Sequence, residues 1–271
     1  MIMVLSTHSL SVGYAAGASH RKLVLEGINA HLAARTLIVL VGANGSGKST
    51  LLRTLCGAQP ALSGEIYIAG VPLSSMSVAA RASQLALVLT DNSSGGGLTV
   101  EEAVAIGRHP YTGLWGRLSR KDHDIIAGAI EAVGMADKRH RFLATLSDGE
   151  RQKVMIARAL AQDTPIIVLD EPTSYLDVAA RFEIMALMRR LVDDLHKTVL
   201  LSSHDIAPAM AVADGVWAVT AVDAAGAPCR RLECVGIGDA AAVMQRVFPD
   251  PHISYNAATG NYEYCRRRRP H

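Results

Sequence analysis

The stretch GANGSGKST at 42–50 constrains the fold of this 271-residue chain more than any other. The apolar run TLIVLVG at 36–42 predicts a buried strand before it, and the sequence from Lys48 to Gly57 predicts a helix after it. A glycine-rich turn between a strand and a helix N-terminus directs backbone N–H groups and positive potential at phosphate. We therefore expect a phosphate-binding loop made by Gly42, Ala43, Asn44, Gly45, Ser46, Gly47, Lys48, Ser49 and Thr50.

Two side chains of this loop have expected contacts of their own. Lys48 is expected to reach the β- and γ-phosphates of a nucleotide, and the Ser49 hydroxyl is expected to hold Mg²⁺. The alternative is a glycine-rich turn with a chance lysine. The order of strand, loop and helix argues strongly against that alternative.

A second apolar segment, PIIVLDEPTS at 165–174, predicts a strand that ends in two acids. Ligands of open α/β sheets bind at the carboxyl edge of the sheet, where this strand delivers Asp170 and Glu171. Asp170 is expected to organise Mg²⁺, directly or through water, and Glu171 to polarise the attacking water as general base. Two acids after a strand are weak evidence alone, but the phosphate loop makes the functional interpretation much stronger.

The remaining patterns predict an α/β fold with a mainly parallel sheet, because strands alternate with helices along the chain. Alternating apolar residues through 4–12 and 23–28 indicate antiparallel strands near the N-terminus. Further strands are expected at 64–70, 85–90 and 198–205.

We expect a main domain at 1–230, with an inserted helical subdomain at about 91–160, followed by an extension at 231–271. In the extension, residues 253–264 predict a β-hairpin, and the chain then carries four consecutive arginines. A solvated tail is the favoured interpretation of these arginines. Contact with acidic lipid headgroups or RNA is the alternative.

The composition is that of a globular protein, with 49% hydrophobic and 19% charged residues. A net charge of +2 gives no argument for nucleic acid as a partner, and the spacing of the four cysteines fits no zinc or disulfide framework. No run approaches the roughly 20 apolar residues of a spanning helix. We expect a soluble chain whose membrane role, if any, comes through a partner.

A second candidate anion site lies in ATLSDGERQKV at 144–154. Ser147 and Glu150 have the spacing of a capping box, which predicts a helix start. A capped helix N-terminus beside a glycine is also an anion site.

The phosphate loop, LSDGERQ at 146–152, IIVLDEPTSYLD at 166–177 and SSHD at 202–205 occur in an order and spacing that resembles an ATP-binding cassette (ABC) ATPase. The resemblance covers about residues 3–220. It implies the ABC ATPase fold, a P-loop parallel-sheet core with an N-terminal antiparallel β subdomain and an inserted helical subdomain. It also implies ATP and Mg²⁺ as cofactors and a homodimer in which one chain's signature segment clamps the γ-phosphate held by the other.

The resemblance implies roles for particular residues. Ser147 and Gly149 would supply the clamp, while Asp148 and Glu150 stand where the commonest family form has Gly and Gln. Tyr14 would stack on adenine. His204 would contact the γ-phosphate and position water. Asp177 would couple the two active sites across the dimer.

One departure concerns the end of the strand LALVLT at 85–90, where the family usually has Gln. Here the position is Thr90, followed by Asp91, and Gln84 lies too early to substitute. Our hypothesis is that Thr90 or Asp91 takes the metal-side role, directly or through water.

The segment LTVEEAVAIGRHPYTGLWGRLSRKDHDII at 98–126 is similar to the iron-siderophore, haem and cobalamin importer branch. This implies an ATPase at the cytoplasmic face of the cell membrane, attached through permease subunits and served indirectly by a periplasmic binding protein. Pro110–Gly113 would lie near the permease, a plain surface loop being the alternative. Two other functions stay open: a non-transport ABC ATPase acting on ribosomes or DNA, and a regulatory ATP-binding module with little turnover.

Overall fold

The computed structural model of the chain describes residues 2–16, 20–89, 97–113, 116–224, 227–250 and 252–264. Its centre is a six-stranded sheet in the order β11-β10-β4-β9-β8-β7. The strands from β10 to β7 are parallel, and β11 pairs antiparallel with β10. Their bounds are Leu37–Val41 (β4), Leu85–Val88 (β7), Ile166–Asp170 (β8), Thr198–Ser202 (β9), Gly215–Ala224 (β10) and Ala227–Gly236 (β11).

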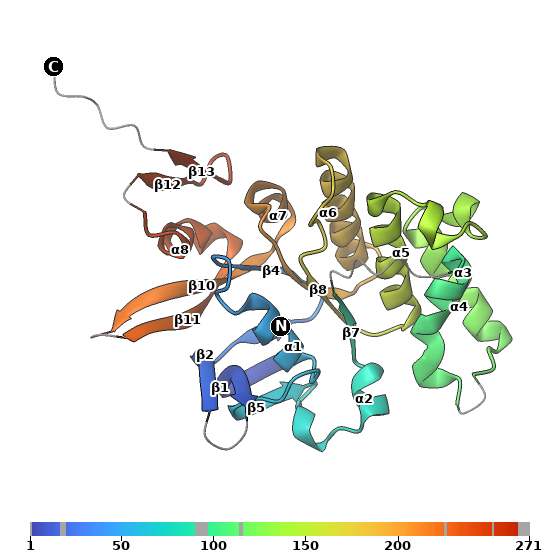
Figure 1. Ribbon diagram of the computed structural model, residues 1–271, viewed down its shortest axis with the longest axis horizontal. Coiled ribbons are helices and arrows are strands. Elements are labelled where there is room, and N and C mark those ends of the chain that lie inside the picture. The colour runs from blue at the N-terminus through green and yellow to red at the C-terminus, as the bar shows by residue number, and fades with distance from the viewer. Residues whose placement is uncertain are drawn as a thin grey trace.

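A second, antiparallel sheet is built from the N-terminal part of the chain (Figure 1). Its order is β2-β1-β5-β6, and the short strand β3 also pairs with β1. The bounds are Met3–Ala16 (β1), His20–Ile28 (β2), His31–Ala33 (β3), Ser63–Ile68 (β5) and Val71–Pro72 (β6). The antiparallel strands expected from the N-terminal alternation are therefore present.

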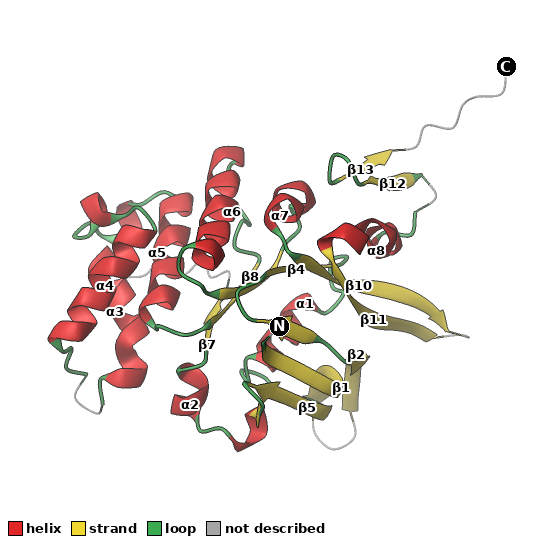
Figure 2. Ribbon diagram, turned by 180° about the vertical axis from the view of Figure 1, so that it is seen from behind, coloured by secondary structure: helices red, strands yellow, loops and turns green. Residues whose placement is uncertain are grey.

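The helices divide into groups by position, as Figure 2 shows from behind. Helices α3, α4 and α5 lie together at the β7 edge of the central sheet, and α8 and the C-terminal hairpin lie at the opposite end. The helix bounds are Lys48–Leu55 (α1), Val78–Ala82 (α2), Val100–Ala105 (α3), Arg120–Ala132 (α4), Asp148–Ala161 (α5), Val178–Asp193 (α6), Ile206–Val212 (α7) and Ala240–Val247 (α8). The 3₁₀ turns are Leu73–Ser75, Ile106–Tyr111, Ala136–Lys138, Leu143–Thr145 and Ile237–Asp239 (η1 to η5).

The central sheet is buried on both faces, which explains its unbroken apolar strands. Val39 and Val41 of β4 belong to a core shared with helices α3 to α8, whereas Leu40 belongs to a core shared with α1 and the antiparallel sheet. Successive side chains of a strand point to opposite faces, so one strand supplies both cores. This double covering fixes the carboxyl ends of β4, β8 and β9 beside one another.

The C-terminal region contains the expected hairpin, as β12 (Ile253–Asn256) and β13 (Asn261–Tyr264). The boundary expected between residues 230 and 231 lies inside β11, so the sheet continues beyond it. Thr90, Asp91 and the four arginines lie outside the described residues. Within the described part of the chain, no helix is both long and apolar enough to cross a membrane.

Candidate functional site

The loop 42–47 joins β4 to α1 and therefore lies at the carboxyl edge of the sheet. Gly47 precedes the helix with a φ of 105°, a left-handed conformation that favours glycine. A Cβ added to Gly47 would lie 2.3 Å from Val24 Cγ1, so the close approach also requires glycine. Gly47 has no side chain that could cap α1, so the backbone N–H groups of the first helical turn are available to bind an anion.

The Lys48 side chain folds back over this loop. It is buried, and Nζ donates to the carbonyl oxygens of Gly42 at 3.0 Å and Ala43 at 3.4 Å. Burial lowers the pKa of Lys48, while the charges of Glu171 and Asp170 oppose that shift. An anion on the loop would stabilise the ammonium form further, because it would add an opposite charge in a low-dielectric setting.

Beside Lys48, the loop holds a second buried polar atom. Ser46 Oγ is buried and has no hydrogen-bond partner among the described residues. A buried hydroxyl without a partner is costly, so a ligand oxygen at this loop would stabilise it. The loop thus has donors suited to phosphate in its backbone and in two side chains.

The two acids at the end of β8 share a buried serine. Ser202 Oγ, at the end of β9, donates to Asp170 Oδ1 at 2.8 Å and accepts from the Glu171 backbone N–H at 2.9 Å. Asp170 is itself buried, and Glu171 has a φ of 52°. This hydroxyl fixes where the strand ends and the direction in which the Glu171 side chain leaves it.

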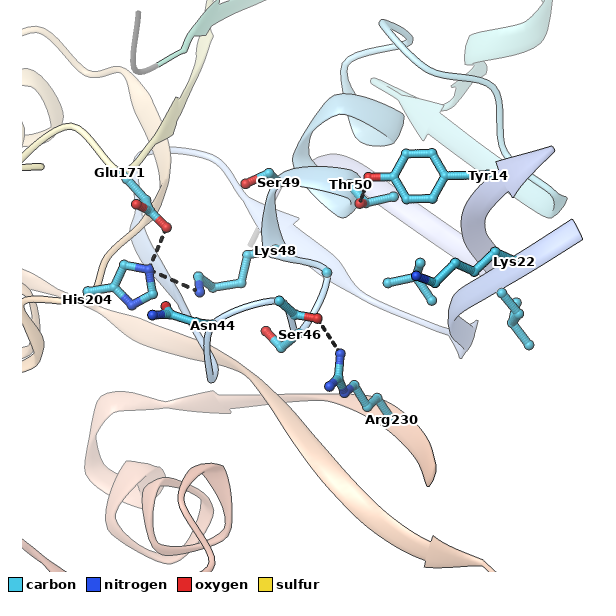
Figure 3. Close-up of a pocket in the computed structure, with 14 residues that line it drawn as sticks. Tyr14, Lys22, Asn44, Ser46, Lys48, Ser49, Thr50, Glu171, His204 and Arg230 are labelled. Atoms are coloured by element: carbon cyan, nitrogen blue, oxygen red, sulfur yellow. Dashed lines mark hydrogen bonds and ion pairs between the residues drawn. The ribbon is translucent and has the colours of Figure 1, made fainter. Parts of the chain in front are cut away.

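The Glu171 carboxylate faces His204, which follows β9 (Figure 3). His204 Nε2 lies 2.6 Å from Glu171 Oε1, and Ser174 Oγ donates to the other carboxylate oxygen at 3.1 Å. A carboxylate only accepts, so Nε2 carries a proton in this contact. The same nitrogen lies 3.5 Å from Lys48 Nζ, so a cation, a carboxylate and an imidazole gather at one point.

These groups open into a cavity of about 580 Å³, a volume suited to a small organic ligand. The phosphate loop, Glu171 and His204 line one side, and Tyr14 lies on the other (Figure 3). The Tyr14 hydroxyl is 2.8 Å from Thr50 Oγ1, which ties the half-exposed ring to the start of α1. Tyr14 is therefore placed where a base attached to the phosphates could lie against it.

The structure also brings two residues to the cavity that the sequence analysis did not single out. Arg230 of β11 donates to the carbonyl oxygen of Gly45, and Lys22 of β2 lies on the Tyr14 side. Neither belongs to a motif. The hairpin pairing of β11 with β10 is local, but only the long-range pairing of β10 with β4 carries Arg230 to the phosphate loop.

Two oxygen donors of the site suit a hard divalent cation. Ser49 lies in the first turn of α1 and lines the cavity, and Asp170 ends β8 at the same edge of the sheet. A hydroxyl and a carboxylate are ligands that Mg²⁺ accepts together with phosphate oxygens and water. The residues present therefore fit Mg²⁺.

The expected helix start at Ser147 is present, with a complete capping box. The Glu150 N–H donates to Ser147 Oγ at 3.3 Å, and the Ser147 N–H donates to Glu150 Oε2 at 3.0 Å. Gly149 lies beside α6, since a Cβ added to it would lie 3.0 Å from Ala180 Cβ. None of the three residues lines the cavity that holds Lys48 and Glu171.

Asp177 caps α6, accepting from the Ala180 N–H at 2.8 Å, and it too lies outside the cavity lining. Thr90 and Asp91 lie outside the described residues, so the hypothesis about them stays a prediction. Gln84 precedes β7, at the end of that strand opposite to the phosphate loop, and its carbonyl oxygen accepts from the Ile166 N–H.

Comparison with known proteins gives consistent findings. The family described as ABC transporter matches residues 25–174. The iron(3+)-hydroxamate import ATP-binding protein FhuC of Bacillus subtilis is 38% identical over 202 residues, covering 74% of this chain and 73% of that protein. The achromobactin transport ATP-binding protein CbrD of Dickeya dadantii is 32% identical over 249 residues, 91% of each chain. A solved dimeric ATP-binding cassette in a post-hydrolysis state with ADP and Pi superposes with a TM-score of 0.68 at 25% identity, covering 79% of this chain and 93% of the other.

Proposed function

Because the chain belongs to the ABC transporter family, we propose that it is the ATP-hydrolysing subunit of an importer. It couples ATP binding and hydrolysis to uptake of an iron chelate, haem or cobalamin through a separate permease. The likeness to an iron(3+)-hydroxamate import ATP-binding protein favours an iron chelate among these. The chain acts at the cytoplasmic face of the cell membrane, and the permease and a periplasmic binding protein select the substrate.

The observation that carries this proposal is the cluster of Lys48, Glu171 and His204 at the mouth of the phosphate loop. The loop N–H groups and Lys48 bind the β- and γ-phosphates, and Tyr14 stacks on adenine. Ser49 and Asp170 would hold Mg²⁺, which supplies positive charge to the phosphate oxygens. Thr90 or Asp91 would take the remaining metal-side role, directly or through water.

Hydrolysis in this site needs a base and a fixed geometry rather than a covalent intermediate. Glu171 polarises the attacking water, and the Ser202 and Ser174 contacts hold its backbone and carboxylate in place. His204, which already donates to Glu171, contacts the γ-phosphate once ATP is bound and positions the water.

The active form is a homodimer with two ATP molecules between the chains. Ser147, Gly149 and Glu150 form an anion-binding helix start that lies outside the cavity of their own chain, which is the arrangement expected if they serve a partner's nucleotide. Asp177 couples the two sites across the dimer. The dimeric cassette with ADP and Pi supports this assembly.

The proposal is tested by co-purifying the chain with its permease subunits and assaying ATP hydrolysis of the complex in lipid vesicles. Turnover is expected to rise when the loaded binding protein is added and to vanish in the Lys48→Ala variant, which loses the phosphate contact. Stimulation by RNA or DNA without any response to the permease would contradict import. Turnover that persists in Lys48→Ala would contradict the assigned site.

A further inference from the structure

The first turn of α5 carries two carboxylates, Asp148 and Glu150. A helix N-terminus contributes only about half a positive charge, and the two acids carry two full negative charges. On these charges alone the turn would repel a phosphate. A signature helix that accepts a γ-phosphate therefore needs cations close to its acids.

The structure gives each acid a basic partner, and the two pairs differ in exposure. Lys138 Nζ donates to Glu150 Oε1 at 2.5 Å, and the side chains are 29% and 26% exposed. Arg151 lies 3.4 Å from Asp148, but the Asp148 side chain is 66% exposed, so solvent screens its charge more strongly. The charge of Glu150 is consequently the one that a cation must offset.

Glu150 is also bound to the residue that would meet the phosphate. Its Oε2 accepts from the Ser147 N–H at 3.0 Å, while Oε1 faces Lys138. Ser147 Oγ accepts from the Glu150 N–H, which leaves the hydroxyl proton of Ser147 to be donated to a ligand. The Glu150 carboxylate thus lies directly beside the donor, where its charge has the largest effect on an incoming anion.

We propose that Lys138 compensates the charge of Glu150, so that the start of α5 can accept the γ-phosphate of an ATP molecule held by a second copy of this chain. The inference rests on the proposed function. It assigns Lys138, from the 3₁₀ turn η3, as a positioning residue that acts through Glu150. The side-chain hydrogen bond between them supports it, since it lowers the pKa of Glu150 and raises the pKa of Lys138, as expected of a charged pair.

The experiment measures ATP-dependent dimerisation by light scattering in a Glu171→Gln background, where hydrolysis does not interfere. Lys138→Met is expected to raise the ATP concentration for half-maximal dimerisation about tenfold, because it removes the cation bonded to Glu150 and leaves only the electrostatic contribution of Arg141. Lys138→Met/Glu150→Gln is expected to restore the parent value, because it removes the carboxylate charge. Lys138→Arg, which keeps the positive charge, is expected to stay near the parent.

The matched control is Lys197→Met, which breaks a lysine–carboxylate pair with Asp163. This pair lies before the amino ends of β8 and β9, away from the phosphate loop. The half-maximal ATP concentration of this variant is expected to match that of the parent. Binding of a fluorescent ATP analogue to the monomer should be unchanged in Lys138→Met, since Lys138 serves the partner's nucleotide. An unchanged half-maximal concentration in Lys138→Met, or no rescue by Glu150→Gln, would overturn the inference. A parent that stays monomeric with ATP would instead refute the proposed dimer.

Discussion

Replacing Ser202 by alanine tests how the two acids of the site are held. The hydroxyl is fully buried and contacts both Asp170 and the backbone of Glu171. Its removal takes away the bond that it accepts from the Glu171 N–H and the bond that it donates to Asp170 Oδ1, a loss of about 1–3 kcal/mol of unfolding free energy. For a domain of this size that corresponds to a Tm lower by roughly 2–4 °C per kcal/mol.

The same change should slow hydrolysis, because Glu171 then leaves the strand in a less defined direction. We expect kcat to fall about tenfold, which is ~1.4 kcal/mol in activation free energy, with a smaller change in KM. The assay is steady-state phosphate release, together with urea unfolding of the same variant.

Thr198→Val is the matched control at the other end of β9. Thr198 is also buried, and its hydroxyl accepts from the Arg35 N–H at 2.9 Å. The two variants should lose similar stability, but only Ser202→Ala should lose turnover. Equal loss of kcat in both would refute the positioning role of Ser202.

Two further predictions concern Arg230 and Asp122. Arg230→Ala removes the bond to the Gly45 carbonyl and should weaken ATP binding about tenfold by titration calorimetry. Arg231→Ala, on the opposite face of β11, should bind ATP normally, and equal weakening would contradict the contact. Hydrogen bonds from Ser119, and then from Arg108, lower the pKa of Asp122 from 3.8 to about 2. Its stabilising contribution is therefore complete above the usual pKa and is lost as the pH falls through about 2. Asp122→Asn should flatten that part of an acid-unfolding curve, and an unchanged curve would refute the assignment.

The elements around the phosphate loop could be predicted from the sequence because their signals are local. An unbroken apolar run predicts a strand that is buried on both faces of a sheet, and β4 is such a strand. The start of α1 at Lys48 follows from the glycines before it. The capping box at Ser147 depends on residues three positions apart, so it too was predictable.

Contacts between distant parts of the chain could not be predicted in this way. Arg230 and the Gly45 carbonyl are 185 positions apart, and only the pairing of β10 with β4 and of β11 with β10 brings them together. The shared hydroxyl of Ser202 depends on the parallel register of β8 and β9, in which Asp170 is opposite Ser202. The hydrophobic pattern of β8 and β9 does not specify which residues of the two strands lie opposite one another.

The C-terminal region shows a second limit. The turn at Gly260 made the hairpin of β12 and β13 recognisable. Helix α8 went unpredicted, although its buried face packs against β10. Its eight residues, three of them alanine, are too short for a strong helical pattern.

The most direct test of the central claim is the mass of the Glu171→Gln variant with saturating ATP, measured by size-exclusion chromatography with light scattering. The Ser147 helix start lies outside its own chain's cavity, so we predict a particle of twice the 28.8 kDa of one chain. It should return to one chain when ATP is removed or when Ser147 is changed to Arg. A particle of 28.8 kDa at every ATP concentration would contradict a nucleotide site completed by a second copy.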